Sequence, residues 1–258
     1  MKKIAFVNHK GGVGKTACSM AFAECLHAQG KRTLLIDLDQ QMNATQIAGI
    51  NSEGIASVYD LMTSDGIAIG EAIVAGKHGD IVPGDRLMIG AERDMRDLMS
   101  PNTRLDDLLR DLPDDAYDYV VIDCPPSLGY VTTNAMVAAD ELVVVVNPDR
   151  ASITGVGSVY ELARKIAANP RLNPALAIAG LLVNCYNYNR RLSRTIDAEL
   201  PELARMCGTK VFRTRIRSCE AVRKAQSQGA SVFDYDPEGN AARDFRQFVA
   251  EYEEGAGE

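Results

Sequence analysis

Short, uninterrupted runs of apolar residues recur along the chain and alternate with segments of helical periodicity. The apolar runs predict buried strands at residues 4–7, 33–36, 119–122, 142–146 and 178–183. Runs without polar alternation are typical of parallel strands that are covered on both faces. The periodic segments predict helices at residues 15–29, 102–112, 131–139, 153–168, 192–206, 217–227 and 239–253.

This alternation of strands and helices predicts an α/β fold with right-handed crossovers, that is, a doubly wound, mostly parallel sheet flanked by helices. The pattern between residues 40 and 100 is irregular, and we predict no individual elements there. A chain of 258 residues can bury a large core without disulfides or a structural metal. We therefore expect a single domain over residues 1–258.

Composition argues against several classes of protein. The longest apolar stretches, at 142–146 and 175–183, fall short of the roughly 18 residues that a membrane-spanning helix needs. The first residues contain too few apolar positions for a secretory signal, so we expect a cytoplasmic protein. The six cysteines show no CxxC spacing, which argues against a zinc ribbon or a redox dithiol. We expect these cysteines to be small, buried apolar residues.

A glycine-rich loop follows the first predicted strand, with the sequence NHKGGVGKT at residues 8–16. Glycines let backbone N–H groups turn inward around an anion, and the N-terminus of the following helix adds its dipole. In such a loop Lys15 would reach the β- and γ-phosphates of a nucleotide, and the Thr16 hydroxyl would bind Mg²⁺. His9 stands where the strict motif has its first glycine, and we interpret it as a plain loop residue. The loop also carries a second lysine, Lys10.

Three segments resemble motifs of the ParA/MinD class of P-loop ATPases. KGGVGKT at 10–16 resembles the deviant Walker A motif of that family, LLIDLDQQMNAT at 34–45 resembles its DLDPQGNAT segment, and VVIDCPP at 120–126 resembles its Walker B strand. Further matching segments extend the resemblance over nearly the whole chain, at residues 147–155, 181–186 and 233–245. The resemblance implies a deviant P-loop NTPase fold and a Mg²⁺-dependent ATPase with ATP as its substrate.

The resemblance also implies roles for individual residues. The extra lysine of the family, here Lys10, reaches the nucleotide of a partner subunit in an ATP-sandwich homodimer. The first aspartate of the DLD segment, here Asp37, holds Mg²⁺ through water, and the second, Asp39, positions or activates the attacking water. Asp123 would support the Mg²⁺ site indirectly. Asn184 would hydrogen-bond the adenine edge, although a strand-end asparagine can instead cap its own backbone.

The predicted site therefore consists of three overlapping sets. The predicted catalytic residues are Lys10, Lys15 and Asp39. The predicted nucleotide-binding residues are Lys10, Gly11, Gly12, Val13, Gly14, Lys15, Thr16, Ala17 and Asn184, and the predicted metal-binding residues are Thr16, Asp37 and Asp123. Gln40 and Met42 stand where the family has Pro and Gly. The resemblance therefore implies neither the conformation of this loop nor the basal rate at which the protein hydrolyses ATP.

The net charge of −7 is unevenly distributed along the chain. Residues 190–224 carry ten basic and four acidic side chains, a net of +6, so the remainder sums to −13. A basic cluster on an acidic protein is typical of proteins that bind phosphate backbones, and related partition ATPases bind DNA through C-terminal arginines. The alternative is a solvated basic face that pairs with the acidic tail at 234–258. The predicted DNA-binding residues are Arg190, Arg191, Arg194, Arg213, Arg215, Arg217, Arg223 and Lys224.

Motifs and charge together predict a DNA-partitioning ATPase with a P-loop core at 1–185, a DNA-facing segment at 190–224 and an acidic tail at 234–258. Its ATP-bound dimer would bind double-stranded DNA non-specifically on the nucleoid and be released when a ParB-like centromere-binding protein stimulates hydrolysis. Two alternatives use a related ATP site: a MinD-like membrane-associated positioning ATPase and a metabolic ligase. The tail carries a net charge of −6, which anionic lipid would repel, so we expect no membrane partner. The DLDQQMNAT segment favours partition over a ligase.

Overall fold

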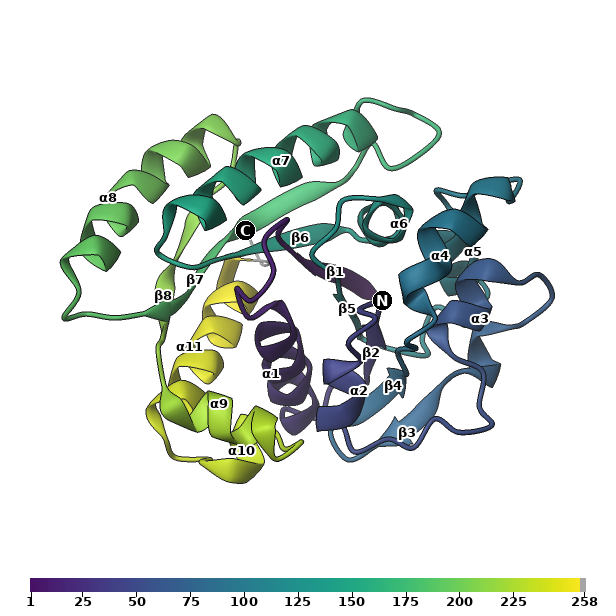
Figure 1. The fold of residues 1–258 in the computed structure, drawn as a ribbon, viewed down its shortest axis with the longest axis horizontal. Coiled ribbons are helices and arrows are strands. Elements are labelled where there is room, and N and C mark those ends of the chain that lie inside the picture. Colours follow the sequence, from purple (N-terminus) through teal and green to yellow (C-terminus); the bar gives the residue numbers. More distant parts are fainter. Residues whose placement is uncertain (256–258) are drawn as a thin grey trace.

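The computed structural model describes residues 1–255. Its strands are β1 (Lys2–Val7), β2 (Thr33–Asp37), β3 (Val74–Gly76), β4 (Gly79–Val82), β5 (Tyr119–Asp123), β6 (Glu141–Val146), β7 (Ala177–Tyr186) and β8 (Val211–Arg217). They form one sheet in the order β3-β4-β2-β5-β1-β6-β7-β8 (Figure 1). Strands β3 and β4 pair antiparallel, and all other neighbours pair parallel. The predicted doubly wound, mostly parallel sheet is thereby confirmed.

Helices cover both faces of this sheet. They are α1 (Lys15–Ala28), α2 (Asn43–Ile47), α3 (Val58–Thr63), α4 (Met88–Asp94), α5 (Arg104–Arg110), α6 (Tyr130–Ala138), α7 (Arg150–Ala167), α8 (Arg191–Met206), α9 (Glu220–Ser227), α10 (Val232–Tyr235) and α11 (Asn240–Gly255), with short 3₁₀ turns at Ile69–Glu71 and Met95–Asp97. Helices α3 to α8 contribute to one apolar core, and α1, α2 and α9 to α11 contribute to the core on the other face.

The five strands expected from the apolar runs are all present, and so are the seven predicted helices, with ends that differ by a few residues. The irregular region between residues 40 and 100 contains α2, α3, α4 and the β3–β4 hairpin. Strand β8 was not predicted, because its sequence VFRTRIR alternates apolar and basic residues instead of forming a continuous run. The helix predicted from residue 217 begins at Glu220, since Arg217 still belongs to β8.

The helix that follows the glycine-rich loop is anchored by aromatic packing. Phe22 of α1 lies 5.4 Å from Phe6 of β1 and 5.7 Å from Phe248 of α11, measured between ring centroids. All three rings are fully buried. Because aromatic side chains bury large apolar areas, this cluster fixes α1 between the central strand and the C-terminal helix.

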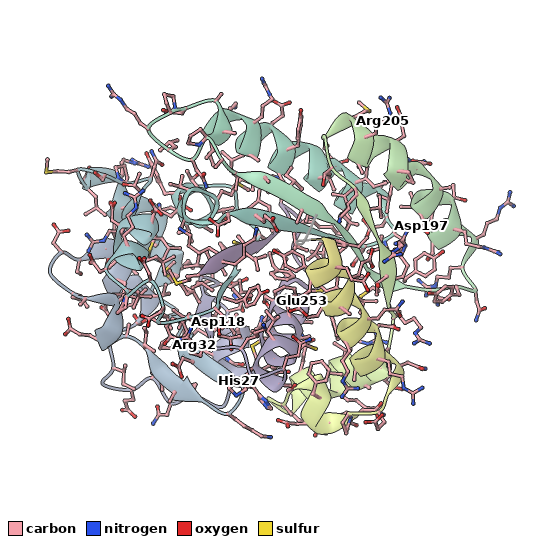
Figure 2. The ribbon with its side chains drawn as sticks, turned by 180° about the vertical axis from the view of Figure 1, so that it is seen from behind. His27, Arg32, Asp118, Asp197, Arg205 and Glu253 are labelled. Carbon is pink, nitrogen blue, oxygen red and sulfur yellow. The ribbon has the colours of Figure 1, made fainter. Side chains whose placement is uncertain are left out.

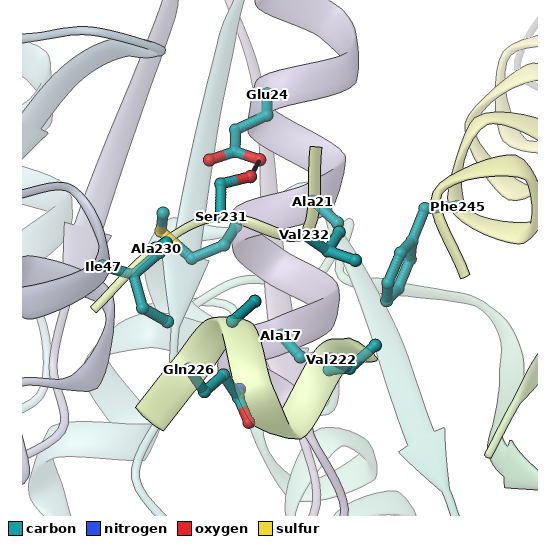
Figure 3. A pocket seen from close by; sticks show the side chains of 12 residues that line it. Ala17, Ala21, Glu24, Ile47, Val222, Gln226, Ala230, Ser231, Val232 and Phe245 are labelled. Carbon is teal, nitrogen blue, oxygen red and sulfur yellow. Dashed lines mark hydrogen bonds between the residues drawn. The ribbon is translucent and has the colours of Figure 1, made fainter. Parts of the chain in front are cut away.

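A polar contact also joins α1 to the C-terminal part of the chain. The Ser231 hydroxyl donates a hydrogen bond to the carboxyl group of Glu24, beside a small cavity of about 20 Å³ lined by α1, α2, α9, α10 and α11 (Figure 3). The other carboxyl oxygen of Glu24 is buried without a hydrogen-bond partner among residues 1–255. Burial raises the pKa of Glu24 to about 7, although the Ser231 hydrogen bond opposes the shift.

Four of the six cysteines are buried as predicted: Cys18, Cys25, Cys124 and Cys207. The prediction was wrong for Cys219, which is partly exposed, and for Cys185, which is exposed. Cys185 has a left-handed backbone with φ of 53°, at a point where the pairing of β7 with β8 becomes irregular. In residues 1–255, no helix is both long and apolar enough to cross a membrane.

Candidate active site

The glycine-rich loop connects β1 to α1 at the carboxyl edge of the parallel strands, where ligands bind in open α/β sheets. Gly12 and Gly14 adopt left-handed backbone conformations, with φ of 74° and 89°. Gly14 is the N-cap of α1 and contributes no side-chain cap, so the first N–H groups of this helix face the loop. Inward N–H groups and a helix N-terminus are the features that bind phosphate.

Asn184 fixes the loop from the neighbouring part of the sheet. Its side-chain Nδ2 donates a hydrogen bond of 2.7 Å to the carbonyl oxygen of Val13. A Cβ atom at Gly14 would lie only 2.1 Å from this nitrogen, so the position requires glycine for steric as well as conformational reasons. Asn184 therefore does not cap its own backbone.

Lys15 lies at the base of the loop with an exposed fraction of only 6%. Its Nζ donates to the carbonyl oxygen of Lys10 at 3.4 Å. Burial lowers the pKa of Lys15, and the nearby Asp123 carboxyl opposes this shift. A buried ammonium group with one long hydrogen bond is suited to receive an anion, because phosphate oxygens would supply the acceptors that it lacks.

Asp37 and Asp123 lie side by side at the ends of β2 and β5, where they are paired in the strand register. Asp37 is fully buried, and its carboxylate accepts hydrogen bonds from the backbone N–H of Asp39 and from the backbone N–H and hydroxyl of Thr45. Burial raises the pKa of Asp37 to about 6 despite these hydrogen bonds. Asp37 thus links the end of β2 to the start of α2. The sequence motif did not indicate this structural role.

Asp123 forms fewer hydrogen bonds than Asp37. Both of its carboxyl oxygens are buried, and neither has a hydrogen-bond partner among residues 1–255. Burial, followed by the charge of Asp37, raises its pKa to about 8, while Thr16 and Lys15 on α1 lower it. Burial and the neighbouring Asp37 therefore favour the neutral form of this carboxyl group.

These observations fit a bound Mg²⁺. Buried, unpartnered carboxyl oxygens next to a threonine hydroxyl are the hard oxygen ligands and water acceptors that this ion uses. Within residues 1–255, no cluster of three or more His, Cys, Asp or Glu side chains could hold a metal alone. Mg²⁺ usually retains several waters and binds through substrate phosphates, so an incomplete protein ligand set is expected for a nucleotide site.

Asp39 lies in the turn between β2 and α2 and is 8% exposed. Its Oδ1 accepts the backbone N–H of Gln41 at 2.9 Å, and its carbonyl oxygen accepts the backbone N–H of Met42. Met42 has a left-handed backbone with φ of 54°, the conformation that the family's glycine adopts without cost. The turn therefore keeps a glycine-like conformation although Met42 carries a side chain.

Lys10 extends from the loop to the junction between β6 and α7. Its Nζ lies 2.7 Å from Oδ2 of Asp149, the N-cap residue of α7. Asn8 also connects the glycine-rich loop to the end of β6. Its side chain accepts a hydrogen bond from the backbone N–H of Lys10 and donates one to the carbonyl oxygen of Val145. Asn8 and Asp149 were missed as site residues. A capping pattern at Asp149 and Ser152 was the available signal for Asp149.

The predicted DNA-binding arginines fall into two groups. Those on β8 are paired with acids: Arg215 with Asp197 of α8, Arg217 with Asp244 of α11, and Arg213 with Glu251 and Glu254 of α11. Lys224 pairs with Glu220 one helical turn away. Part of the basic segment therefore does pair with the acidic tail. The other four predicted DNA-binding arginines form no ion pair within residues 1–255: Arg190, Arg191, Arg194 and Arg223.

Three of these unpaired arginines lie in the loop after β7 and the first turn of α8. Burial raises the pKa of the Cys185 thiol near the end of β7, and the charge of Arg223 of α9 opposes this shift, so the two side chains are near each other. Because β7 ends at the same edge of the sheet as β1, the unpaired arginines lie at the edge that carries the glycine-rich loop. Arg205, which pairs with Glu202, lies at the far end of α8 (Figure 2).

Comparison with known proteins supports a nucleotide site here. A family model described as an AAA domain (AAA_31) matches residues 1–178. The sporulation initiation inhibitor protein Soj of Bacillus subtilis is 33% identical over 253 residues, which cover 97% of this chain and 97% of that protein. The chromosome-partitioning ATPase Soj of Thermus thermophilus is 34% identical over 251 residues, which cover 97% of this chain and 95% of that protein.

Solved structures include proteins of similar fold. A cobyrinic acid a,c-diamide synthase from Mycobacterium smegmatis with bound ADP and magnesium superimposes with a TM-score of 0.80 at 26% sequence identity, covering 97% of this chain and 93% of that chain. That structure and the Soj proteins each match 97% of the present chain.

Proposed function

Because the chain belongs to the family of the ParA and Soj partition ATPases, we propose that it acts as a nucleotide-controlled DNA-binding dimer that segregates a plasmid or a chromosome region. It is an ATPase that uses ATP and Mg²⁺. In the proposed cycle, the ATP-bound dimer holds DNA without reading its bases. A ParB-like centromere-binding protein stimulates ATP hydrolysis, and hydrolysis releases the protein from DNA.

We assign the phosphate-binding role to the glycine-rich loop and Lys15. The N–H groups at the start of α1 and the buried ammonium group would together surround the β- and γ-phosphates. Mg²⁺, when bound with ATP, neutralises charge that develops during phosphoryl transfer. Thr16 would bind the ion, and Asp123 and Asp37 would hold its waters. Asp39 would orient the attacking water from the turn after β2.

The proposed dimer depends on Lys10. Its side chain is about one third exposed and lies at the rim of the loop, whereas that of Lys15 lies at the base. Lys15 already occupies the base, so a second lysine at the rim is available to a nucleotide bound by another subunit. ATP would then be part of the dimer interface, and its hydrolysis would weaken that interface.

The unpaired arginines after β7 are the observation that carries the DNA-binding part of the proposal. Arg190, Arg191 and Arg194 lie in one short segment without ion pairs in residues 1–255, so they are free to bind phosphates. They lie at the edge of the sheet that carries the nucleotide site, so dimerisation through that edge would bring two sets of arginines together. Two copies of a weak phosphate-binding surface bind far more tightly than one.

The two alternatives are less well supported. A MinD-like role needs a basic membrane-binding segment, whereas the described part of α11 carries an excess of acidic residues. The synthase structure resembles the chain in fold, but the Soj proteins share more sequence over a similar length. ATP hydrolysis that rises with DNA and a partner protein, and not with a metabolite, would separate partition from ligase chemistry.

The test is DNA binding at increasing salt concentration, with ATP and with ADP. We expect binding with ATP that falls steeply with salt, because phosphate contacts release counterions. Charge reversal of Arg190 and Arg191 should weaken binding at least tenfold. The control is Arg205→Glu, a charge reversal at a paired arginine near the other end of α8, which is compared with the single reversal Arg191→Glu. Equal binding with ATP and ADP, or equal losses in both variants, would contradict the proposal.

A further inference from the structure

Two large apolar side chains are exposed among the unpaired arginines at the start of α8. Tyr188, in the loop after β7, and Leu192, in the first turn of the helix, are each 58% exposed. Residues 188–194 also include three arginines and no acidic residue. Cations alone suffice to bind phosphates, so the two apolar side chains indicate a ligand that offers apolar surface as well as negative charge.

The Tyr188 ring is held in place although much of it is exposed. It packs edge-to-face against Tyr186, with 4.7 Å between ring centroids and 78° between ring planes, and Tyr186 is itself only 6% exposed. Asn187 fixes the backbone of the loop, because its carbonyl oxygen accepts the N–H of Arg190 and its side-chain oxygen accepts the N–H of Asn189. A ring that is already oriented loses little conformational entropy when it contacts a ligand.

Leu192 lies outside the face through which α8 packs on the rest of the protein. The buried residues of that face are Ser193, Ile196, Leu200 and Ala204. Leu192 therefore contributes little to the packing of α8 and is available to a ligand that reaches the same segment as Tyr188.

From these observations we propose that Tyr188 and Leu192 insert between base pairs of the bound DNA, while the arginines around them hold its phosphates. The inference rests on the proposed DNA-binding function. Proteins that insert apolar side chains into the minor groove flank them with basic residues, partly unstack one base step and bend the duplex. Bound DNA is then bent, and binding favours base steps that unstack easily, although no base edge is read.

An anionic lipid surface fits this segment less well than DNA does. Further along α8, Glu199 and Glu202 have accessible side chains. A helix that lies on an anionic membrane needs a basic polar face along its length, and these carboxylates would be repelled. The basic and apolar part of α8 is confined to its start, which suits a minor groove that is about 6 Å wide.

The first test measures DNA binding with ATP at several salt concentrations. Tyr188→Ala should bind between roughly fivefold and a hundredfold more weakly, because a contact between the ring and a base is lost. Its dependence on salt should equal that of the parent, since no phosphate contact is removed. Arg190→Ala should instead reduce the slope of log affinity against log salt by about one for each bound subunit.

Two further variants separate the ring from the hydroxyl group and the position from mere exposure. Tyr188→Phe keeps the ring and should bind as the parent does. Leu192→Ala should weaken binding without a change in salt slope, as Tyr188→Ala does. Its matched control is Met206→Ala, which removes another exposed apolar side chain of α8 at the far end of the helix and should have no effect.

The second test compares two duplexes of identical base composition, one of alternating TA steps and one with an uninterrupted A-tract. TA steps unstack easily, whereas A-tracts are stiff. The ratio of the two affinities should favour the TA duplex in the parent and fall severalfold in Tyr188→Ala. Energy transfer between dyes at the two ends of the TA duplex should show a bend with the parent that is smaller with Tyr188→Ala.

Light scattering with ATP checks that each variant still forms the dimer, and if one variant fails this check, the other decides. Equal DNA affinity of the parent, Tyr188→Ala and Leu192→Ala would overturn the inference and leave the arginine contacts standing. Unchanged DNA binding together with lost binding to phosphatidylglycerol vesicles would also overturn it and assign the two side chains to lipid. If the parent bound no DNA with ATP, the proposed function would fail as well.

Discussion

The Ser231 hydroxyl donates to the buried carboxyl group of Glu24 and thereby joins helix α10 to helix α1, which begins at the nucleotide site. Glu24 lies near the middle of α1 with an exposed fraction of 4%. A carboxyl group in this environment favours its neutral form, so the contact between the two helices depends on pH.

Glu24→Gln should stabilise the protein at alkaline pH. The pKa of Glu24 is about 7 in the folded chain and near 4.5 when unfolded. The folded state therefore binds more protons between these values, and stability falls as pH rises from about 4.5 to 7. The glutamine variant has no carboxyl group to ionise and does not lose this stability. Its free energy of unfolding should therefore exceed that of the parent by roughly 2–3 kcal/mol at pH 8.

The measurement is urea unfolding at pH 5 and pH 8, with Glu53→Gln as a control at an exposed position. A stability difference that is the same at both pH values would show that Glu24 does not titrate in this range.

Lys15→Ala should weaken ATP binding by roughly a hundredfold, because a charged hydrogen-bond donor at the base of the loop is lost. Binding is measured with a fluorescent ATP analogue. Lys31→Ala, which removes an exposed lysine at the opposite edge of the sheet, should bind as the parent does. An unaffected Lys15→Ala protein would mean that the loop does not use this lysine.

Lys10→Ala should separate binding from assembly. The variant should keep ATP binding, because Lys10 lies at the rim of the loop, but it should lose ATP-dependent dimerisation and turnover. Light scattering and phosphate release measure the two properties. A variant that still dimerised with ATP would remove the proposed contact with the second subunit.

Asp39→Ala should give a long-lived ATP dimer. Asp39 is proposed to orient the attacking water, so its loss slows hydrolysis by about 100-fold or more, while the phosphate-binding groups remain. Dimer lifetime after removal of free ATP is the readout. Asp114→Ala, at an exposed position away from the site, is the control and should turn over normally. Rapid dissociation of the Asp39→Ala dimer would assign hydrolysis to another group.

Met42→Gly should increase the free energy of unfolding by about 0.5–1 kcal/mol, because glycine adopts the left-handed conformation of this position without strain and part of the gain is lost to backbone entropy. Thermal unfolding measures the change. Gln41→Gly, at a neighbouring position with negative φ, should be destabilising instead. If both glycine variants lowered stability, the Met42 conformation would carry no cost.

The parts of the site that could be predicted from sequence are those contained in contiguous segments. Gly12, Gly14 and Lys15 follow one strand directly, and their spacing alone indicates a phosphate loop. The contacts of Asn184 with Val13 and of Lys10 with Asp149 join residues 171 and 139 positions apart, so local spacing carries no signal for them.

The elements of the fold likewise fall into those that the sequence predicts and those that it does not. The buried parallel strands are continuous apolar runs and were found from hydropathy, whereas β3 and β4 are short and β8 alternates. The sequence gives the charge of Arg213, Arg215 and Arg217, but their acidic partners on α8 and α11 become visible only when β8 is paired with β7. The arginines of β8 and those after β7 carry the same charge, but only the arginines of β8 form ion pairs.

Strand β8 ends the sheet, so one side of its backbone has no neighbouring strand in residues 1–255. Such an edge can recruit a strand from another molecule and start aggregation. Arginines at alternate positions of β8, each held by an acid, would have to be stripped of their partners before a foreign strand could dock. These ion pairs therefore protect the outer edge of β8 from pairing with a strand of another molecule.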